Sequence, residues 1–210
     1  MFNYTGIKRI FDFFGALVGL IIFSPVMILL GLYIYLVSPG PIFADIPMRI
    51  GRDGGLFRMF KFRSMIPNAH QFLLDHPNLY EQYVQNGYKL ADDPRWIKGA
   101  KFIRKYSLDE LPQFFNVLIG NMSLVGPRAY YPFEIESQQK LHPETVPYVK
   151  KLLTLKPGLT GPWQVGGRGE LNFVERAKLD SQYAENSSII YDITIILKTP
   201  LAMLSGRGAV

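Results

Sequence analysis

The 210-residue sequence contains no cysteine and only three histidines, and these absences exclude several classes of site. Without cysteine there is no disulfide scaffold, no thiolate nucleophile and no cysteine-bound zinc. The histidines are scattered and form no H-x-x-x-H pair, so a histidine-rich metal site is not expected. Charged residues make up only 19% of the sequence against 48% hydrophobic residues, which excludes a mostly disordered chain.

Net positive charge is present instead, because the formal net charge at pH 7 is +6. A basic protein favours partners that carry phosphate groups or an anionic lipid surface. The basic residues are not gathered in one run, and a long apolar segment has no use in a nucleic-acid binder. The composition therefore predicts phosphate-bearing partners and no nucleic acid.

One long hydrophobic run lies near the N-terminus, where residues 13–37 include no charged side chain. A straight helix of this length measures about 37 Å, enough to cross a hydrocarbon core of about 30 Å. The run is too long for a secretory signal, and no small-x-small cleavage site follows it. We expect two parts, a membrane anchor over residues 1–37 and a globular domain over residues 38–210.

Ser24 and Pro25 stand at the centre of this run. Proline removes one backbone hydrogen bond and collides with the preceding turn, so the helix should bend there. The Ser24 hydroxyl could donate a hydrogen bond to the carbonyl that Pro25 frees. Basic residues flank the run on both sides, which suits two cytoplasmic flanks. The residues alone leave open a kinked spanning helix and a re-entrant helix whose ends return to one face.

The helix and hairpin signals in residues 38–210 predict an α+β fold that is mostly helical. Asp53-Gly54 between apolar segments is typical of a small β-hairpin, and its second arm is expected to be extended from Leu56 to Arg63. Lys61 and Arg63, two residues apart on that arm, should share one face of a strand. Short polar helices are expected in residues 67–91, the second closed by Asn86-Gly87.

Helix boundaries are also marked in the second half of the sequence. An apolar helix should end near Gly120, and Asn172-x-x-Glu175 is a capping box for a helix over residues 173–185. Ser188 should cap a last helix over residues 189–204, which is apolar but interrupted by charges and a proline. This segment fits an amphipathic helix lying on the membrane or on the core.

Asp109 and Glu110 stand between a basic stretch and the apolar helix. Ser107-x-x-Glu110 matches a capping box, and under that interpretation both acidic residues only cap the helix. If Pro112 is instead the first helical residue, they lie just before it. Either way Asp109 lies at a helix N-terminus, whose partial positive charge favours an ionised carboxylate and attracts phosphate. Such a carboxylate can attack phosphorus, and a neighbouring one can hold Mg²⁺.

Several long motifs follow one another along the sequence: Lys8-Arg9-Ile10-Phe11-Asp12, Ser24-Pro25, Lys61-Phe62-Arg63-Ser64-Met65, Asp93-Pro94-Arg95, Ser107-Leu108-Asp109-Glu110-Leu111-Pro112-Gln113, Asn116-Val117-Leu118, Met122-Ser123-Leu124-Val125-Gly126-Pro127-Arg128, Lys156-Pro157-Gly158-Leu159-Thr160-Gly161 and Gln164. In these motifs and in their order, almost from end to end, the chain resembles the bacterial sugar transferases, also called monotopic phosphoglycosyl transferases.

The resemblance implies an enzyme that moves a sugar 1-phosphate from a UDP-sugar to undecaprenyl phosphate and releases UMP. It implies a re-entrant first helix broken at Ser24-Pro25, with the catalytic domain on the cytoplasmic face of the bacterial inner membrane. Asp109 would form a covalent phosphosugar intermediate, Glu110 would bind Mg²⁺, and Arg128 would lie near the nucleotide. Such enzymes start the membrane steps of exopolysaccharide, capsule, O-antigen or glycoprotein glycan synthesis.

Other residues are candidates with competing structural interpretations. Lys61, Arg63, Arg95 and Arg104 could hold phosphate, or could be solvated surface residues. Asp93 could join Asp109 and Glu110 around the metal, or could merely start a turn before Pro94.

Two positions depart from the family pattern: Asn121 stands where aspartate is usual, and Ala129 where proline is usual, so sugar or nucleotide preference is uncertain. A homo-oligomer and a catalytically inactive membrane-anchored scaffold remain open alternatives.

Overall fold

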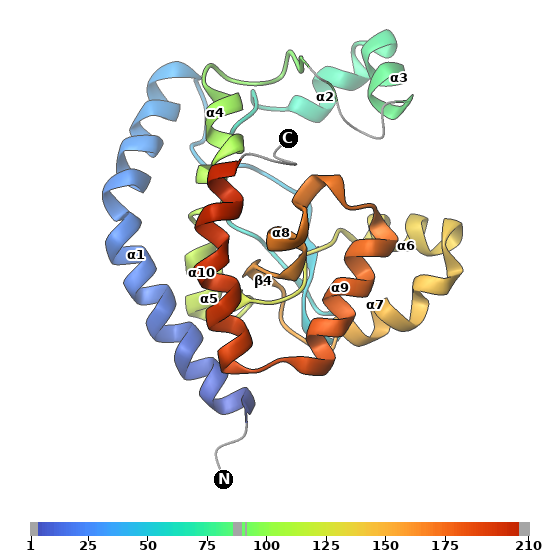
Figure 1. Ribbon diagram of the computed structural model, residues 1–210. Coiled ribbons are helices and arrows are strands. Elements are labelled where there is room, and N and C mark those ends of the chain that lie inside the picture. The colour runs from blue at the N-terminus through green and yellow to red at the C-terminus, as the bar shows by residue number, and fades with distance from the viewer. Residues whose placement is uncertain (1–3, 86–89, 91, 206–210) are drawn as a thin grey trace.

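The computed structural model describes residues 4–85, 90 and 92–205 of the chain. One long N-terminal helix, α1 (Tyr4–Val37), lies along one side of a body built mainly from shorter helices (Figure 1). The predicted α+β class with a mostly helical content is confirmed. The predicted closure of a helix by Asn86-Gly87 lies outside the described residues.

The remaining elements are short and are separated by turns. In chain order they are β1 (Arg49–Ile50), the 3₁₀ turn η1 (Arg52–Gly54), β2 (Leu56–Phe57), α2 (Ala69–Leu74), α3 (Pro77–Gln85), α4 (Ala100–Lys105), η2 (Leu108–Glu110), α5 (Gln113–Ile119), β3 (Ser123–Val125), α6 (Pro132–Leu141), η3 (Pro143–Thr145), α7 (Val146–Leu152), β4 (Gly158–Thr160), α8 (Pro162–Gly166), η4 (Arg168–Glu170), α9 (Phe173–Asn186) and α10 (Ile189–Ser205). β1 pairs antiparallel with β2, and β3 pairs parallel with β4.

The helix α1 continues through Ser24 and Pro25, so the expected break takes the form of a bend within one curved helix (Figure 1). Pro25 has no N–H with which to bond the carbonyl of Ile21, four residues earlier. The Ser24 hydroxyl donates to that carbonyl over 2.9 Å. The predicted compensation by Ser24 is therefore confirmed.

One face of α1 packs on the rest of the molecule along its whole length. Lys8, Asp12 and Ala16 are buried near the start of the helix, and Leu30 and Ile34 are buried near its end. In between, α1 crosses α5, where Gly19 leaves room for the ring of Phe114. The opposite face is apolar and exposed, with side chains such as Ile10, Phe14, Ile21, Ile28 and Leu36. Within the described residues, α1 alone is long and apolar enough to cross a membrane.

The hairpin is shorter than the sequence suggests. Regular pairing ends at Phe57, and the following segment makes only an isolated bridge between Phe43 and Phe62. The expectation that Lys61 and Arg63 lie on one strand is therefore wrong. They lie on an extended segment held by backbone hydrogen bonds to residues 42–44, and their side chains contact different partners.

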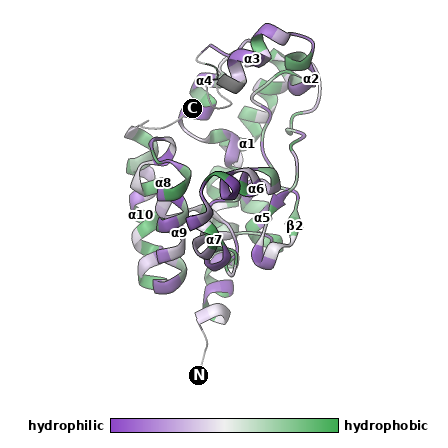
Figure 2. Cartoon of the chain, turned by 90° about the vertical axis from the view of Figure 1, so that its right-hand side faces the viewer, coloured by the Kyte–Doolittle hydropathy of each residue, from purple (hydrophilic) through white to green (hydrophobic). Residues whose placement is uncertain are grey.

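The other helix boundaries agree with the sequence signals. Gly120 ends α5 with a φ of 92°, which glycine adopts without strain. Asn172 and Glu175 form the capping box of α9, each side chain bonding the other's backbone N–H over 2.9 Å. Ser188 accepts a hydrogen bond from the backbone of Tyr191 at the start of α10. Residues 67–91 contain two short helices, α2 and α3, which lie together at one end of the molecule (Figures 1 and 2).

The strand pair β3–β4 brings two loops together in the middle of the domain. Gly126 follows β3 and contacts the backbone around Pro157 so closely that an added Cβ would collide with it. Gly158 begins β4, directly after this contact. This close approach fixes the Gly-Pro-Arg loop (residues 126–128) beside the segment that leads into α8, and both loops border the functional site.

Candidate active site

The acidic pair lies in the 3₁₀ turn η2, directly before α5. Ser107 has a left-handed backbone conformation with a φ of 52°, and its side chain makes no capping hydrogen bond. Its hydroxyl instead accepts a hydrogen bond from Arg168 Nη2 over 2.7 Å. The capping-box interpretation of Ser107 and Glu110 is therefore wrong, and both acidic residues lie ahead of the helix.

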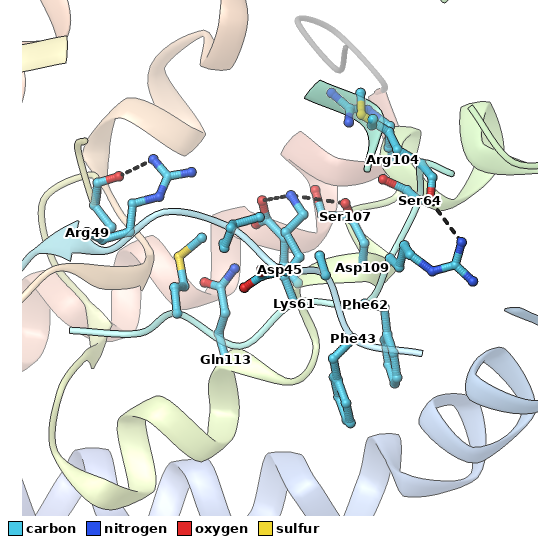
Figure 3. A pocket seen from close by; sticks show the side chains of 18 of the residues that line it. Phe43, Asp45, Arg49, Lys61, Phe62, Ser64, Arg104, Ser107, Asp109 and Gln113 are labelled. Atoms are coloured by element: carbon cyan, nitrogen blue, oxygen red, sulfur yellow. Dashed lines mark hydrogen bonds and ion pairs between the residues drawn. The ribbon is translucent and has the colours of Figure 1, made fainter. Parts of the chain in front are cut away.

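Lys61 pairs with both acidic residues (Figure 3). Its Nζ lies 3.0 Å from Asp109 Oδ2 and 3.4 Å from Glu110 Oε1. The Asp109 residue is only 2% exposed, and its backbone carbonyl accepts a hydrogen bond from Phe62 N. Apart from the ion pair with Lys61, Asp109 Oδ2 has no hydrogen-bond partner within the described part of the chain. Asp109 Oδ2 can therefore accept a further ligand.

Burial dominates the electrostatics of this pair. It raises the pKa of Asp109 above its usual value, Lys61 opposes the rise, and the neighbouring Glu110 adds to it. This differs from the expected helix-terminus effect, because the 3₁₀ turn removes Asp109 from water. Burial would lower the pKa of Lys61, but the carboxylates of Asp109 and Glu110 outweigh it and raise that pKa. Lys61 therefore remains a cation beside the acidic pair.

Asn116 positions the segment that carries Lys61. It is fully buried on α5, and its side-chain oxygen accepts from Phe60 N while its amide donates to the Arg58 carbonyl, both over 2.8 Å. These two bonds fix the backbone directly before Lys61. The helix that follows the acidic pair thus also holds the cation that faces it.

A cavity of about 1110 Å³ opens above Asp109. Its lining is strongly basic, with eight arginine or lysine residues against three carboxylates. The cations are Arg49, Lys61, Arg63, Arg95, Arg104, Arg128, Arg168 and Arg176, and the carboxylates are Asp45, Asp109 and Glu110. In Figure 3, Arg49 and Arg104 lie on opposite sides of the Lys61–Asp109 pair. Such a cavity suits a ligand with more than one phosphate group.

All five predicted phosphate-binding residues line this cavity, but several of them, Arg63 and Arg95 included, already bind groups of the chain itself. Arg63 donates to the hydroxyl and the carbonyl of Ser38 and to the carbonyl of Pro41. Arg95 forms a buried ion pair with Asp93. Both arginines hold the cavity wall together, and their binding of phosphate stays a prediction.

The described residues contain no group of three or more acidic or histidine side chains placed to hold a metal ion. Asp93, which is bound to Arg95, thus does not join Asp109 and Glu110 in one cluster. Asp109 and Glu110 themselves fit Mg²⁺. Carboxylate oxygens are hard ligands, and Asp109 Oδ2 has no partner among the described residues besides the ion pair with Lys61. Mg²⁺ commonly uses one or two carboxylates together with substrate phosphates and water.

Arg128 borders the cavity from the Gly-Pro-Arg loop. Its backbone N–H donates to Asp180 Oδ2 over 2.9 Å, and its guanidinium lies 5.0 Å from the ring centroid of Trp163. The two departures from the family pattern differ in position. Ala129 lines the cavity, whereas Asn121 is exposed and is not among the lining residues.

The sequence matches the model of the bacterial sugar transferase family over residues 3–206. The chain belongs to this family. It is 44% identical over 96% of its length to the galactosyl transferase CpsE of Streptococcus agalactiae, covering 43% of that protein. It is 40% identical over 97% of its length to the undecaprenyl-phosphate galactose phosphotransferase of Salmonella typhimurium, covering 41% of that protein.

A shorter relative matches almost throughout. The exopolysaccharide production protein ExoY of Rhizobium meliloti is 35% identical over 96% of this chain, and 87% of that protein is covered. The sugar transferase chain described here thus spans less than half of the two longer relatives and most of this shorter one.

Several residues of this sugar transferase site were not singled out from the sequence. Arg49, Arg168 and Arg176 line the cavity, and Asn116 positions Lys61. No pattern in the sequence marked Arg168. The structure does mark it, since its φ of 52° is unusual for a residue other than glycine. Asn116 had a visible signal, because it is a polar residue with apolar neighbours on both sides in α5.

Proposed function

We propose that this chain transfers a sugar 1-phosphate from a UDP-sugar to undecaprenyl phosphate and releases UMP. The buried Asp109 carboxylate carries the proposal, because within the described residues one of its oxygens has Lys61 as its only partner and lies at a strongly basic cavity. The name of one relative, the undecaprenyl-phosphate galactose phosphotransferase of Salmonella typhimurium, supports transfer of a sugar phosphate to this lipid.

In the first step an oxygen of Asp109 attacks the β-phosphorus of the donor. A bond forms between this oxygen and phosphorus, the bond from phosphorus to the bridging oxygen breaks, and that oxygen leaves as part of UMP. Lys61 lies beside the attacking oxygen and orients it, while Arg104 on α4 adds positive charge for the transferred phosphate. No proton is needed, since both the nucleophile and the leaving phosphate are anions.

In the second step an oxygen of undecaprenyl phosphate attacks the same phosphorus and displaces Asp109. A covalent intermediate lets a water-soluble donor and a lipid acceptor use one site in turn. Glu110 and Asp109 are the residues that would hold Mg²⁺, which when bound supplies charge neutralisation on the phosphates.

The packing of α1 supports a helix that enters and leaves the membrane on one side. Both ends of α1 contact the same body: Arg9 donates to the carbonyls of Val117 and Leu118, and the Tyr33 hydroxyl donates to the carbonyl of Lys98. A helix that crossed the bilayer would carry one of these ends to the opposite side, away from the domain. We propose a phospholipid bilayer against the exposed face of α1 and the catalytic domain on the cytoplasmic face of the bacterial inner membrane.

A second apolar surface supports the same placement. Exposed apolar residues of α10 include Ile190, Ile193, Leu197, Leu201 and Leu204, whose spacing of three and four residues places them on one helical face. Such a face suits a helix at the level of the lipid headgroups, where the phosphate of the acceptor lies. The cavity would then receive the lipid from this level and the nucleotide from water.

Labelling of engineered cysteines tests the topology, because the chain has none of its own. A cysteine placed near position 3 and another near position 45 should both react with a membrane-impermeant reagent from the cytoplasmic side of inverted vesicles. Reaction of the two positions from opposite sides would show a spanning helix and overturn the re-entrant proposal.

The reaction is tested with the purified protein, Mg²⁺, undecaprenyl phosphate and a panel of UDP-sugars. We expect UMP release with at least one donor, its loss in Asp109→Asn, and its loss with a chelator. Protein mixed with donor alone should gain the mass of one sugar phosphate on Asp109. A folded protein that releases no UMP from any donor would instead match the scaffold alternative, and full activity in Asp109→Asn would overturn the covalent scheme.

A further inference from the structure

Three arginines of the cavity lining, Arg49, Arg128 and Arg176, lie close enough that the charge of Arg128 acts on both of the others. Arg49 lies across the Lys61–Asp109 pair from Arg104 in Figure 3. Arg49 comes from β1, Arg128 from the Gly-Pro-Arg loop and Arg176 from α9. We call Arg49, Arg128 and Arg176 the arginine trio. Of these three, only Arg128 was a candidate phosphate-binding residue from the sequence. The roles of Arg49 and Arg176 follow from their surroundings.

Each member of the arginine trio has an unused donor. The Nε atoms of Arg49, Arg128 and Arg176 are all buried and have no hydrogen-bond partner within the described residues. Arg49 itself is 9% exposed, so water cannot easily replace a missing partner. Buried donors without partners are rare and costly in folded proteins, and they indicate a ligand that completes them.

The charges of the trio are also poorly balanced. Among the ion pairs of the described residues, the trio has one, between Arg128 Nε and Glu134 Oε1 at 4.0 Å. Burial lowers the pKa of both Arg49 and Arg176, and the nearby charge of Arg128 lowers each further. Three like charges held together in a partly buried wall favour an anion between them.

Two members of the trio, Arg49 and Arg128, pack against aromatic rings. The Arg49 guanidinium carbon lies 3.3 Å from the centroid of the Tyr131 ring, and its Nη1 donates to the carbonyl of Ala129. Arg128 lies over the ring of Trp163. These contacts hold two planar guanidinium groups in fixed orientations, which suits bidentate binding of a phosphate.

The position of the trio decides which phosphate it fits. Asp109 and Lys61 lie nearer the Arg104 side of the cavity, and α4, which carries Arg104, packs against the end of α1 (Figure 1). Arg176 belongs to α9 and Arg128 to the loop that precedes α6, and both of these helices lie on the side of the domain away from α1 (Figure 1). A lipid phosphate arrives from the membrane side, so the far side is left for the water-soluble nucleotide.

We infer that Arg49, Arg128 and Arg176 form a second anion site that holds the donor phosphate nearer the nucleoside and stabilises it as the nucleoside monophosphate leaves. This inference rests on the proposed function. When the bond from the β-phosphorus to the bridging oxygen breaks, that oxygen keeps the electron pair and the departing phosphate gains one negative charge. The trio gains attraction as this charge develops, so it acts on the rate as well as on binding.

Binding of UMP to the full-length protein in detergent tests the site directly. Arg176→Gln removes one cation and should weaken UMP binding by about tenfold, the usual scale for a charge-assisted hydrogen bond. Lys178→Gln is the matched control, because Lys178 lies two residues along α9, is exposed and does not line the cavity. It should bind UMP as the unaltered protein does.

A second variant guards against misfolding. Arg176→Lys keeps the charge but loses the planar fork, so we expect an intermediate loss of UMP affinity with an unchanged melting temperature. If Arg176→Gln and Arg176→Lys both fold and bind UMP as tightly as the unaltered protein, the inference is wrong.

The two half-reactions separate the donor from the acceptor. Formation of the phosphosugar adduct from a UDP-sugar should slow in Arg176→Gln, and its transfer to undecaprenyl phosphate should slow less. Slowing confined to the second half-reaction would assign the trio to the lipid phosphate and overturn the inference. Absence of adduct and UMP release in the unaltered protein would contradict the proposed function, whereas loss of UMP binding in Arg176→Gln would still support the site.

Discussion

Two regions of the molecule contain the same set of charged groups, one lysine between two carboxylates, and use it differently. In the first, at the base of α1, Lys8 pairs with Asp12 over 2.8 Å and with Asp192 over 3.1 Å. In the second, Lys61 pairs with Asp109 over 3.0 Å and with Glu110 over 3.4 Å. We call them the anchor cluster and the site cluster.

The anchor cluster is completed by hydrogen bonds from the protein. Asp12 Oδ1 also accepts from Leu124 N, and Asp192 accepts from the hydroxyls of Tyr183 and Tyr4. Every carboxylate of the anchor cluster thus has a second kind of donor besides Lys8. Buried charges are tolerated when they are paired and fully hydrogen-bonded, so this cluster joins α1 to β3 and α10.

The site cluster lacks this completion. Asp109 Oδ2 has only the Lys61 ion pair among the described residues, and both carboxylates border the basic cavity. The difference teaches that burial of a lysine–carboxylate group does not itself indicate function. The Asp109 oxygen that has one ion pair and the open cavity distinguish the site cluster, to which we assign the chemistry, from the anchor cluster.

The largest effect that would sharpen this comparison is the loss of transfer in Asp109→Asn. The amide is a poor nucleophile, so we expect UMP release to fall by at least about a thousandfold. The melting temperature should stay the same or rise, because the variant removes a buried charge that the protein alone does not complete. UMP release and thermal melting in detergent measure the two effects. A folded variant that retains transfer would break the comparison at its reactive end.

Removal of a charge from the anchor cluster should have the reverse pattern. Asp192→Asn leaves Lys8 with one carboxylate and should lower the free energy of unfolding by about 3 kcal/mol. Asp92→Asn is the matched control, since Asp92 pairs with Lys101 at the surface and should change stability by less than about 1 kcal/mol. Denaturant titration in detergent measures both. Equal stability of Asp192→Asn and Asp92→Asn would contradict a structural role for the anchor cluster.

The two lysines provide the third test. Lys61→Gln should slow UMP release by about a hundredfold, because it removes the positive charge beside the attacking oxygen. Lys8→Gln should chiefly lower the melting temperature and leave turnover per folded molecule within a few-fold of the unaltered protein. Single-turnover rates, corrected for the folded fraction, measure the contrast. Similar rate losses in both variants would show that the anchor cluster also controls the chemistry.

Much of the local structure was predictable, because the signals are local. The capping box of Asn172 and Glu175, the end of α5 at Gly120 and the bond from Ser24 each depend on residues within four positions. The long apolar run likewise determined α1. The family motifs identified Asp109, Glu110 and Arg128, whose positions at one cavity agree with that assignment.

The failures involve contacts between residues that are distant in the sequence. Ser107 matched a capping box, but Arg168, sixty-one residues later, bonds its hydroxyl in a left-handed turn. Arg63 was expected to share one face of a strand with Lys61, but its guanidinium bonds the hydroxyl and the carbonyl of Ser38, twenty-five residues earlier. The role of Asn116 depends on a loop more than fifty residues earlier. Spacing along one sequence cannot reveal such partners.

Another buried carboxylate, that of Asp180, gives the smallest and last test of the comparison. It is fully buried beneath the arginine trio, and burial raises its pKa to about 7, against the opposing effects of the Arg128 backbone N–H and of the charges of Arg128 and Arg176. Between about pH 4 and pH 7 the folded state therefore keeps a proton that the unfolded state has lost. The free energy of unfolding should fall with rising pH in this window, by about 2 kcal/mol between pH 5 and pH 7.

Asp180→Asn cannot ionise, so its stability should lack this part of the slope. Denaturant titrations of both proteins at pH 5, 6, 7 and 8 measure the difference, and the other titrating groups cancel in the comparison. Parallel curves would show that Asp180 ionises normally, as a satisfied carboxylate of the anchor type does. A free energy of unfolding that falls between pH 5 and pH 7 in the unaltered protein but not in Asp180→Asn would place Asp180 with the site cluster, as a buried group that the protein completes only in part.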